Sequence, residues 1–249
     1  IEAQQRWHHL IDYAVVLGDK SFAAADALSA LSPVAVRDAL KSGTFVDDLA
    51  VGPVEPHAWV EAILADTERL AGAGPRAMRA HTGASASVRR ELLRECGGMP
   101  TGLVLGEDMV LGYRLREGGA VFVPDRDAHS LHLGATTVMR DAESVNRYNK
   151  PALAQHVPEF RGHRLQMHRS YVVPYVEVVV PVAEASYEEV CLAVNAQLTG
   201  AVPDLVVTLV AEWPPATAAR LQVLSDRQLD LRLIQTAYAA EARVRLASE

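Results

Sequence analysis

A run of strand-forming residues, Y-V-E-V-V-V-P-V at 175–182, constrains the possible folds more than any other segment of the chain. It is rich in β-branched residues, which favour extended backbone. Ser186 and Glu189 follow it at the spacing of a capping box, which predicts that a helix begins there. The apolar residues that this helix would place on one face are Val190, Val194 and Leu198.

The same alternation continues toward the end of the chain. A second apolar strand is predicted at 205–210, a polar helix from about 215 to 228, and a third strand around 231–234. Strands that alternate with helices in this way are typical of βαβ units, whose strands are parallel. The chain is therefore expected to be an α/β protein with a Rossmann-like parallel sheet.

The first part of the chain is expected to be a mainly helical scaffold. At 5–42 apolar residues recur at helical spacing, and Ser32 followed by Pro33 provides an N-cap with proline at the first helical position. Gly, Pro and Asp mark a loop at 43–56, and a surface helix is predicted at 57–70. The residues that carry the helical spacing of the first segment are Leu10, Ala14 and Leu17.

Composition narrows the class of protein. The 249 residues are 49% hydrophobic with a formal net charge of −7, which favours a globular protein and argues against nucleic-acid binding, because phosphate-binding surfaces are usually basic. Cys96 and Cys191 form no C-x-x-C pair, which favours a reducing compartment. No apolar run reaches the roughly 20 residues of a membrane span, and no signal peptide is recognisable, so a cytoplasmic protein is expected.

Two adjacent carboxylates, Glu107 and Asp108, begin an amphipathic helix predicted at 107–117. Acidic residues in a first helical turn are stabilised by the helix dipole, by roughly 0.3–1 kcal/mol each, and this alone could account for the pair. Helical spacing, however, places Asp108 on the inward, apolar face, where a bare carboxylate would cost several kcal/mol. A carboxylate that is held in a cleft is a typical general base.

Small residues at 83–87, G-A-S-A-S, lead into a short helix that is expected to end at Gly97 and Gly98. Such a loop allows a ligand to approach backbone N–H groups closely, although a tight turn beneath a strand would have the same composition. The loop lacks the G-x-S-x-G pattern of serine hydrolases, so a nucleophilic serine is not expected.

Taken together, three motifs resemble the C-terminal half of a glycosyltransferase family 2 domain. They are G-A-S-A-S-V-R-R-E-L-L-R-E-C-G-G-M-P from residue 83, G-E-D-M-V-L-G-Y-R-L-R-E-G-G-A-V-F-V-P from residue 106, and a histidine shortly afterwards. Enzymes of that family have the GT-A fold and transfer a sugar from a nucleotide-sugar to an acceptor with inversion. The resemblance therefore implies a nucleotide-sugar donor and a sugar or glycan acceptor as partners.

The resemblance also implies roles for individual residues. Asp108 would be the base that deprotonates the acceptor hydroxyl, and Glu107 would help to shape the acceptor site. His132 would bind the divalent cation, Mn²⁺ or Mg²⁺, that holds the diphosphate, although a single histidine at a strand end is more often a structural residue. The residues that would contact donor or acceptor in this part of the chain are Gly83, Ala84, Ser85 and Arg114.

A literal D-x-D sequence, the form in which the family binds the same metal, occurs at 125–127. In the family this motif precedes the small-residue loop, whereas here it follows the loop. Asp125 and Asp127 are therefore interpreted as turn residues after Pro124.

The Rossmann-like segment follows the part that resembles the C-terminal half, whereas the family has the reverse order. We expect residues 1–168 to be the C-terminal half of one transferase domain and 169–249 to begin a second one in tandem; a permuted order is the alternative. The missing initiator Met and the abrupt end favour the tandem arrangement. Within the second segment, Pro181 and Glu212 are the residues expected near a nucleotide.

Two other functions remain open. The second segment has V-A-E-W-P-P where the family usually has an acidic and serine-bearing loop, so a non-catalytic, degenerate transferase-like binding or scaffolding module is one alternative. A different nucleotide-binding α/β enzyme is the other, but 175–249 contains neither G-x-G-x-x-G nor a Walker lysine loop. A D-x-D motif upstream of residue 1 would favour the enzyme over the scaffold.

Overall fold

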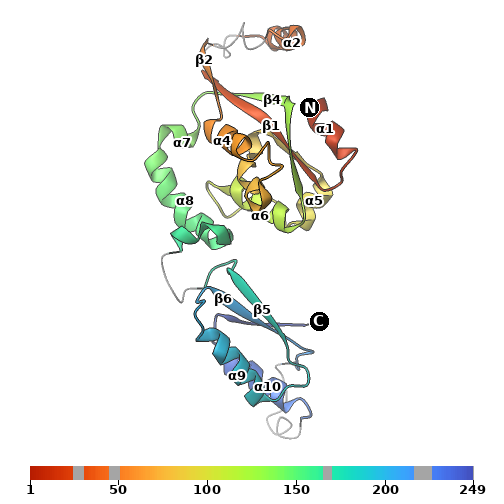
Figure 1. Ribbon diagram of the computed structural model, residues 1–249, viewed down its shortest axis with the longest axis vertical. Helices are drawn as coiled ribbons and strands as arrows, with labels where there is room; N and C mark the ends of the chain where they lie inside the picture. Colours follow the sequence, from red (N-terminus) through yellow and green to blue (C-terminus); the bar gives the residue numbers. More distant parts are fainter. Residues whose placement is uncertain (25–30, 45–50, 165–169, 216–225, 249) are drawn as a thin grey trace. The chain divides into compact units, whose positions relative to one another are not determined.

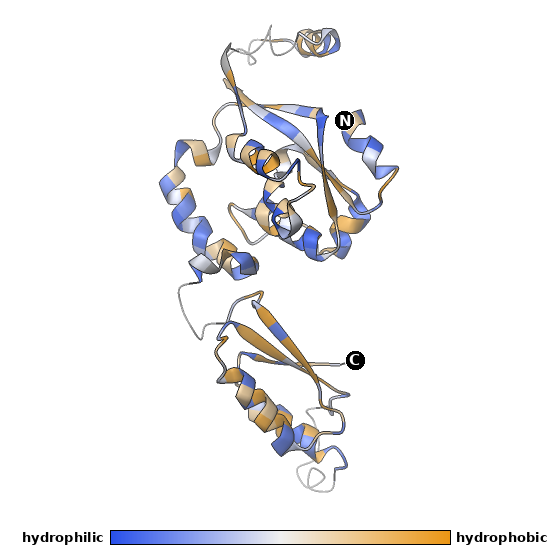
Figure 2. Cartoon of the chain, viewed as in Figure 1, coloured by the Kyte–Doolittle hydropathy of each residue, from blue (hydrophilic) through white to orange (hydrophobic). Residues whose placement is uncertain are grey.

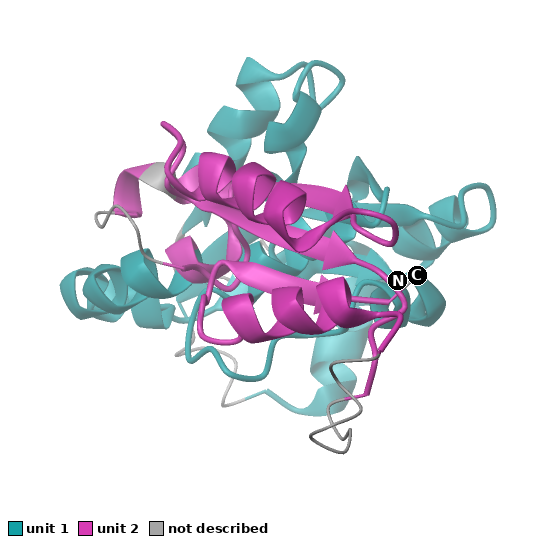
Figure 3. Cartoon of the chain, turned by 90° about the horizontal axis from the view of Figure 1, so that it is seen from below, with its two compact units in different colours: residues 1–153 teal, residues 154–249 magenta. Residues whose placement is uncertain are grey.

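The computed structural model of the protein describes residues 1–24, 31–44, 51–164, 170–215 and 226–248. They form two compact units, unit 1 at Ile1–Leu153 and unit 2 at Ala154–Glu249 (Figure 3). Each unit has its own sheet, and both sheets contain parallel strands that alternate with helices. The α/β class expected from the sequence is therefore confirmed.

Strand β1 (Ala14–Ala24) is the centre of the sheet in unit 1 (Figure 1). It pairs antiparallel with β2 (Val51–Pro56) and β3 (Ala86–Val88), and parallel with β4 (Val121–Leu133). The first four residues of β1 form a continuous apolar run, A-V-V-L, that is buried. Runs of this kind suit a strand that is covered on both faces.

The prediction of a mainly helical segment at 5–42 is wrong. Of the described residues there, only the end of α1 (Glu2–His8) and α2 (Pro33–Ser42) are helical, with β1 between them. A short apolar run fits helical spacing and a buried strand equally well, so periodicity alone could not decide between them. The N-cap prediction is confirmed, because the Ser32 hydroxyl accepts a hydrogen bond of 3.2 Å from the Ala35 N–H.

The other helices of unit 1 follow the predictions around the motifs. Helix α6 (Glu107–Glu117) has the predicted bounds, α5 (Arg90–Glu95) follows the small-residue loop, and α4 (Ala58–Asp66) is shorter than the predicted surface helix. A loop was predicted at 43–56, but residues 51–56 form strand β2, so this part of the prediction is wrong. Residues 45–50 lie outside the described part of the chain. The remaining helical elements are η2 (Gly74–Ala80), η3 (Gly83–Ser85), α7 (Thr137–Arg140), α8 (Ala142–His156), which runs across the boundary between the units, and η4 (Pro158–His163) in unit 2.

Three parallel strands form the sheet of unit 2, in the order β5 (Val176–Pro181), β6 (Leu205–Val210) and β7 (Val244–Ala247). Helices α9 (Tyr187–Leu198) and α10 (Leu229–Tyr238) lie side by side on one face of this sheet (Figure 1). Apolar residues of the strands and of both helices form its core, and β5 and β6 are largely apolar along their length (Figure 2). The predicted order of strands and helices is confirmed, although the last helix and the last strand lie at other residues than predicted.

Two local predictions in unit 2 have opposite outcomes. The capping box is present, since the Ser186 hydroxyl and the Glu189 carboxylate each accept a hydrogen bond from the other residue's backbone N–H. The third strand predicted around 231–234 is wrong, because this segment belongs to α10 and the strand is β7 instead. Leu231, Ile234 and Tyr238 recur at helical spacing and pack into the core. Most of the helix predicted at 215–228 lies outside the described residues.

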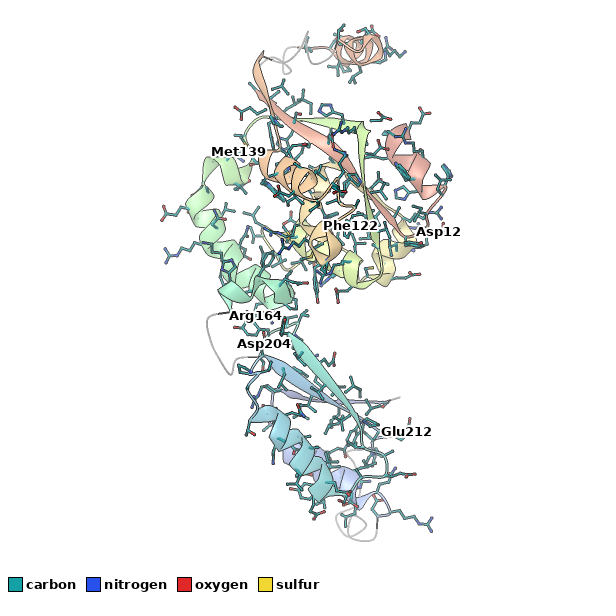
Figure 4. All side chains as sticks on the ribbon, viewed as in Figure 1. Asp12, Phe122, Met139, Arg164, Asp204 and Glu212 are labelled. Atoms are coloured by element: carbon teal, nitrogen blue, oxygen red, sulfur yellow. The ribbon has the colours of Figure 1, made fainter. Side chains whose placement is uncertain are left out.

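One buried ion pair fixes the beginning of unit 2. The Arg164 guanidinium donates to the Asp204 carboxylate at 2.6 Å, and to the carbonyl oxygens of Ala154 and Val173 at 2.8 and 2.7 Å (Figure 4). These bonds attach the segment after residue 153 to the sheet of unit 2. The compact units divide at 153/154, and the tandem transferase domains expected at 1–168 and 169–249 stay a prediction.

Helix α1 is attached to the sheet of unit 1 through Asp125, a buried carboxylate in β4. It accepts hydrogen bonds from the Arg6 guanidinium at 2.7–3.0 Å, from the Trp7 indole at 2.6 Å and from the Asp127 backbone N–H at 2.9 Å. Burial alone would raise the pKa of Asp125, but these hydrogen bonds outweigh it and hold the pKa below its ordinary value. The interpretation of Asp125 and Asp127 as turn residues is wrong: both belong to β4, where its register with β1 is irregular.

Neither a membrane span nor a disulfide occurs in the described part of the chain. None of its helices has the length and hydropathy that crossing a bilayer requires. Cys96 in unit 1 and Cys191 in unit 2 are both free thiols.

Replacing Trp7 with Phe should lower the free energy of unfolding by about 1–3 kcal/mol at pH 7, because the buried Asp125 carboxylate loses one charge-assisted hydrogen bond and keeps those from Arg6. The pKa of Asp125 is lower in the folded state, so its contribution to stability is fully present above its unfolded pKa of about 3.9 and is lost as the pH falls below it. The stability difference between wild type and Trp7→Phe should therefore shrink below about pH 4. Urea unfolding followed by circular dichroism at both pH values measures this.

Trp59→Phe is the matched control, since it shortens a half-exposed indole and should change stability by less than about 0.5 kcal/mol. Equal stability of wild type and Trp7→Phe at pH 7 would contradict the role of the indole.

Candidate functional site

Asp108 lies in the first turn of α6, at a place that the local backbone determines. Gly106 precedes the helix with φ of +87°, a left-handed conformation that favours glycine. A Cβ at this position would also lie 2.8 Å from the Leu153 side chain. The helix is held against the core of unit 1 by its buried residues Val110, Leu111 and Leu115.

The Asp108 carboxylate lies against the small-residue turn η3. A Cβ on Gly83 would overlap the Oδ1 atom of Asp108, so the two groups are this close only because residue 83 is glycine. Gly83 and Ala84 are exposed, and none of the ion pairs within the described segments involves Asp108. Asp108 is therefore a half-buried carboxylate beside a solvent-accessible turn, and none of the described cations lies within ion-pair distance of it.

His81 supports Asp108 from the interior of the unit. Its Nδ1 lies 2.8 Å from the backbone carbonyl oxygen of Asp108, to which the ring donates, and only 3% of the residue is exposed. Burial lowers the pKa of His81, although the hydrogen bond to Asp108 acts in the opposite direction. The ring is therefore neutral at pH 7. Gly112 permits the contact, because a Cβ there would lie 3.1 Å from the Cβ of His81 and 2.9 Å from the carbonyl oxygen of Met78.

One face of β1 borders the same turn. Gly18, Lys20 and Phe22 alternate along the strand and therefore point to one side of the sheet. A Cβ on Gly18 would lie 2.5 Å from the Ser85 hydroxyl, so this face of β1 meets η3. Further along, the Asp108 carboxylate is close enough to Lys20 to raise its pKa, although burial has the larger effect and lowers it. Asp108, Ser85 and Lys20 therefore belong to one site.

Four aromatic side chains extend the site along β1: Phe22, His57, Trp59 and His132, here called the ring cluster. The ring centroids of Phe22 lie 5.2 Å from His57 and 5.3 Å from His132, and those of His57 and Trp59 are 4.9 Å apart. The Lys20 Nζ lies 5.3 Å from the centroid of Phe22, within the range of a cation–π contact. The site therefore combines a carboxylate, an ammonium group and apolar ring surfaces.

A small pocket of about 180 Å³ adjoins the ring cluster at the end of β1. Pockets that enclose whole small molecules usually measure about 300–1,000 Å³, so this one has room for part of a ligand. Its lining residues are Phe22, Ala23, Ala24, Glu55, Gly134, Ala135 and Met139, the last of which is labelled in Figure 4.

His132, the residue predicted to bind a divalent cation, pairs with Phe22 across β4 and β1. Its Nδ1 lies 3.2 Å from the Gly134 carbonyl oxygen, which leaves Nε2 as the ring atom that could bind a cation. Among the residues that the structure describes, no group of three or more His, Cys, Asp or Glu side chains is arranged to hold a metal ion. Lys20 places a positive charge beside the same rings. These residues do not fit a divalent-cation site, and the metal role of His132 stays a prediction.

Two of the other predicted residues carry polar atoms without partners. The Oε2 atom of Glu107 and the hydroxyl of Ser85 are buried and form no hydrogen bond with any described residue. Buried polar atoms are nearly always paired, so these two are candidates to bind polar groups of a ligand.

Arg114, in contrast, lies toward the other end of α6 from Asp108. Its guanidinium donates to the carbonyl oxygens of Gly97 and Gly98 at 3.3 and 3.1 Å. These bonds hold the turn that follows α5. The structure therefore does not bring Arg114 together with Asp108.

In unit 2, Pro181 ends β5 and Glu212 follows β6, both at the carboxyl edge where parallel α/β sheets bind ligands (Figure 4). Glu212 lines a pocket of about 390 Å³, and Pro181 is not part of its lining. Carboxylates outnumber cations among the described residues that line this pocket, and this charge disfavours a diphosphate. The lining residues are Ala183, Glu184, Ala185, Glu212, Arg227, Gln228, Asp230 and Leu231.

Lys20, His57 and His81 are functional candidates that the sequence analysis missed. Lys20 was hidden because β1 was predicted as helix, which obscured its alternation with Gly18 and Phe22. His57 and His81 belong to no motif, and only the folded chain brings them beside Lys20 and Asp108. The A-V-V-L run was the available signal: read as a buried strand, it would have placed Lys20 on the same side of the sheet as Gly18 and Phe22.

No protein-family model matches the sequence, and no curated protein matches it significantly. The geometry of Asp108, Lys20 and the ring cluster is therefore the basis for inferring a function.

In an NMR titration, the His57 ring should stay neutral until about pH 4, because burial, the charge of Lys20 and the neighbouring His132 lower its pKa to about 4. Lys20→Met should raise the pKa of His57, since it removes the positive charge that helps to lower it. Lys150→Met, which removes an exposed lysine of α8, should leave it unchanged. A wild-type midpoint near the ordinary value of about 6.5 would contradict the position of His57 beside Lys20.

Proposed function

We propose that the chain is an inverting glycosyltransferase with a GT-A fold, similar to family 2 enzymes, in which Asp108 is the general base. The donor would be a nucleotide-sugar, and the acceptor a sugar or glycan hydroxyl. One observation carries the proposal: the Asp108 carboxylate lies against an exposed glycine turn, without a partner cation within ion-pair distance among the described residues.

The proposed chemistry requires a single carboxylate. The acceptor oxygen attacks the anomeric carbon and its proton passes to Asp108, while the bond from that carbon to the phosphate oxygen breaks and the oxygen keeps the electron pair. A base is needed only on the face opposite the leaving group, whereas glycoside hydrolases use two carboxylates at a defined separation. Glu107 is thus not needed as a second acid, and its unpaired oxygen suits a hydrogen bond from an acceptor hydroxyl.

The order of elements in unit 1 supports the GT-A part of the proposal. The turn η3 and strand β3 lead into α5, and α6 leads into β4, the sequence of motifs on which the family resemblance rests. The buried ring of His81 donates to the backbone carbonyl oxygen of Asp108, which fixes the backbone from which the proposed base extends. A positioned base of this kind accelerates proton transfer by roughly 10²- to 10⁴-fold.

The charge of the pocket in unit 2 favours a second function for that unit, a non-catalytic binding or scaffolding module. Among the described lining residues, Glu184, Glu212 and Asp230 oppose one cation, Arg227. Since like charges repel a diphosphate, donor binding is assigned to unit 1 and unit 2 is proposed to be a degenerate transferase-like domain.

Asp108→Asn should lower kcat for sugar transfer by about 10²- to 10⁴-fold, because the amide keeps the size of the side chain and cannot accept the proton. Stability should change little, since the carboxylate forms no ion pair within the described part of unit 1. Transfer and hydrolysis are measured with uridine, guanosine and thymidine diphosphate sugars, with and without a glycan acceptor. Turnover equal to that of wild type would rule out Asp108 as the base.

Gly83→Ala should lower turnover by about 10²-fold, since the new Cβ displaces the Asp108 carboxylate by overlapping its Oδ1. Its unfolding midpoint should stay close to that of wild type, because a flexible carboxylate can move away. The matched control is Gly102→Ala, where a Cβ meets no atom within 4 Å and activity should be retained. Full activity of Gly83→Ala would show that the turn does not position the base.

A further inference from the structure

Lys20 is a half-buried lysine in the middle of β1, on the face that borders Asp108 and the ring cluster. We propose that its ammonium group binds the phosphate oxygens of the donor and stabilises the diphosphate as it leaves. This inference rests on the proposed function. It assigns to a lysine the neutralisation of charge that the sequence analysis attributed to a divalent cation at His132.

The backbone of Lys20 is held on two sides. It pairs with Ser130 in the parallel ladder with β4, and its carbonyl oxygen accepts a hydrogen bond of 3.1 Å from the backbone N–H of His57. The stem of the side chain then runs over Phe22, where Nζ lies 5.3 Å from the ring centroid. The ammonium group therefore projects from a rigid strand between the base and the ring cluster.

Lys20 differs from neighbouring cations of unit 1 because it has no anionic partner within ion-pair distance among the residues described. Arg69 pairs with Asp19, and Arg89 pairs with Asp12. Arg114, as shown above, is engaged with backbone carbonyl oxygens. A partly buried ammonium group that lacks such a partner is costly, and a bound anion relieves that cost.

The chemistry of the transfer supplies such an anion. When the bond between the anomeric carbon and the phosphate oxygen breaks, the electron pair remains on that oxygen and negative charge develops there. Lysine binds phosphate as a point charge with three donors, and a fixed cation stabilises the leaving group without moving a proton. The Asp108 carboxylate takes the proton of the acceptor, and the Lys20 ammonium group stabilises the charge on the leaving diphosphate.

Isothermal titration calorimetry with inorganic pyrophosphate tests the inference, with EDTA present so that no metal bridges protein and ligand. Lys20→Met should weaken binding by about 10-fold or more, and Lys20→Arg should retain most of it. Lys150→Met removes the same charge from the exposed face of α8 and should bind as wild type does. Equal affinity of Lys20→Met and wild type would overturn the inference.

Asp108→Asn separates this inference from the proposed function. It should abolish transfer and bind pyrophosphate as tightly as wild type or more tightly, because a nearby negative charge is removed. If Asp108→Asn retained full transfer, the base assignment would fail, while binding that depends on Lys20 would still support the anion site.

If Lys20→Met does not fold, the wild-type protein provides the test. Pyrophosphate should shift the NMR signals of His57 and Phe22 and raise the pKa of His57, because the added anion offsets the charge of Lys20. Unchanged signals of both residues at saturating pyrophosphate would overturn the inference.

Discussion

Ala14 pairs with Val121 and Ala23 with Leu133 in the parallel ladder between β1 and β4, on which the site in unit 1 depends. This pairing joins segments about a hundred residues apart in sequence and places Phe22 opposite His132. The ladder is irregular between Gly18 and Lys20, and the extra residues of β4 there include Asp127, which pairs with Arg6 of α1. One irregular stretch thus serves both the attachment of α1 and the spacing of the site.

Elements with strong local signals could be predicted from the sequence, whereas β1 could not. The capping box of Ser186 and Glu189 and the N-cap at Ser32 depend on neighbouring residues only, so their geometry follows from spacing. The A-V-V-L run of β1 is a strand because β3 and β4 pair with it on both edges. A single sequence does not reveal those partners, and the apolar spacing favoured a helix instead.

In the candidate site, too, residues with local sequence signals could be predicted, whereas residues that depend on distant contacts could not. Glu107 and Asp108 were found because both lie at the start of a helix whose pattern is local, and the glycine turn precedes them at a recognisable spacing. His81 and His57 act through backbone contacts with Asp108 and Lys20, which exist only in the folded unit. Arg114 was selected because it shares the helix with Asp108, but its position near the other end directs it to the turn after α5.

The roles proposed for Asp108 and Lys20 require that the two side chains do not pair with each other. If the two formed a direct ion pair, the ammonium group would hold the carboxylate in its ionised form and occupy the lone pair that must accept a proton. The carboxylate would in turn compete with phosphate for the ammonium group. Among the residues described, the two form no ion pair: Asp108 lies against Gly83, and the Lys20 ammonium group lies over the ring of Phe22. In the proposed reaction, the acceptor hydroxyl would contact Asp108 and the diphosphate of the donor would contact Lys20.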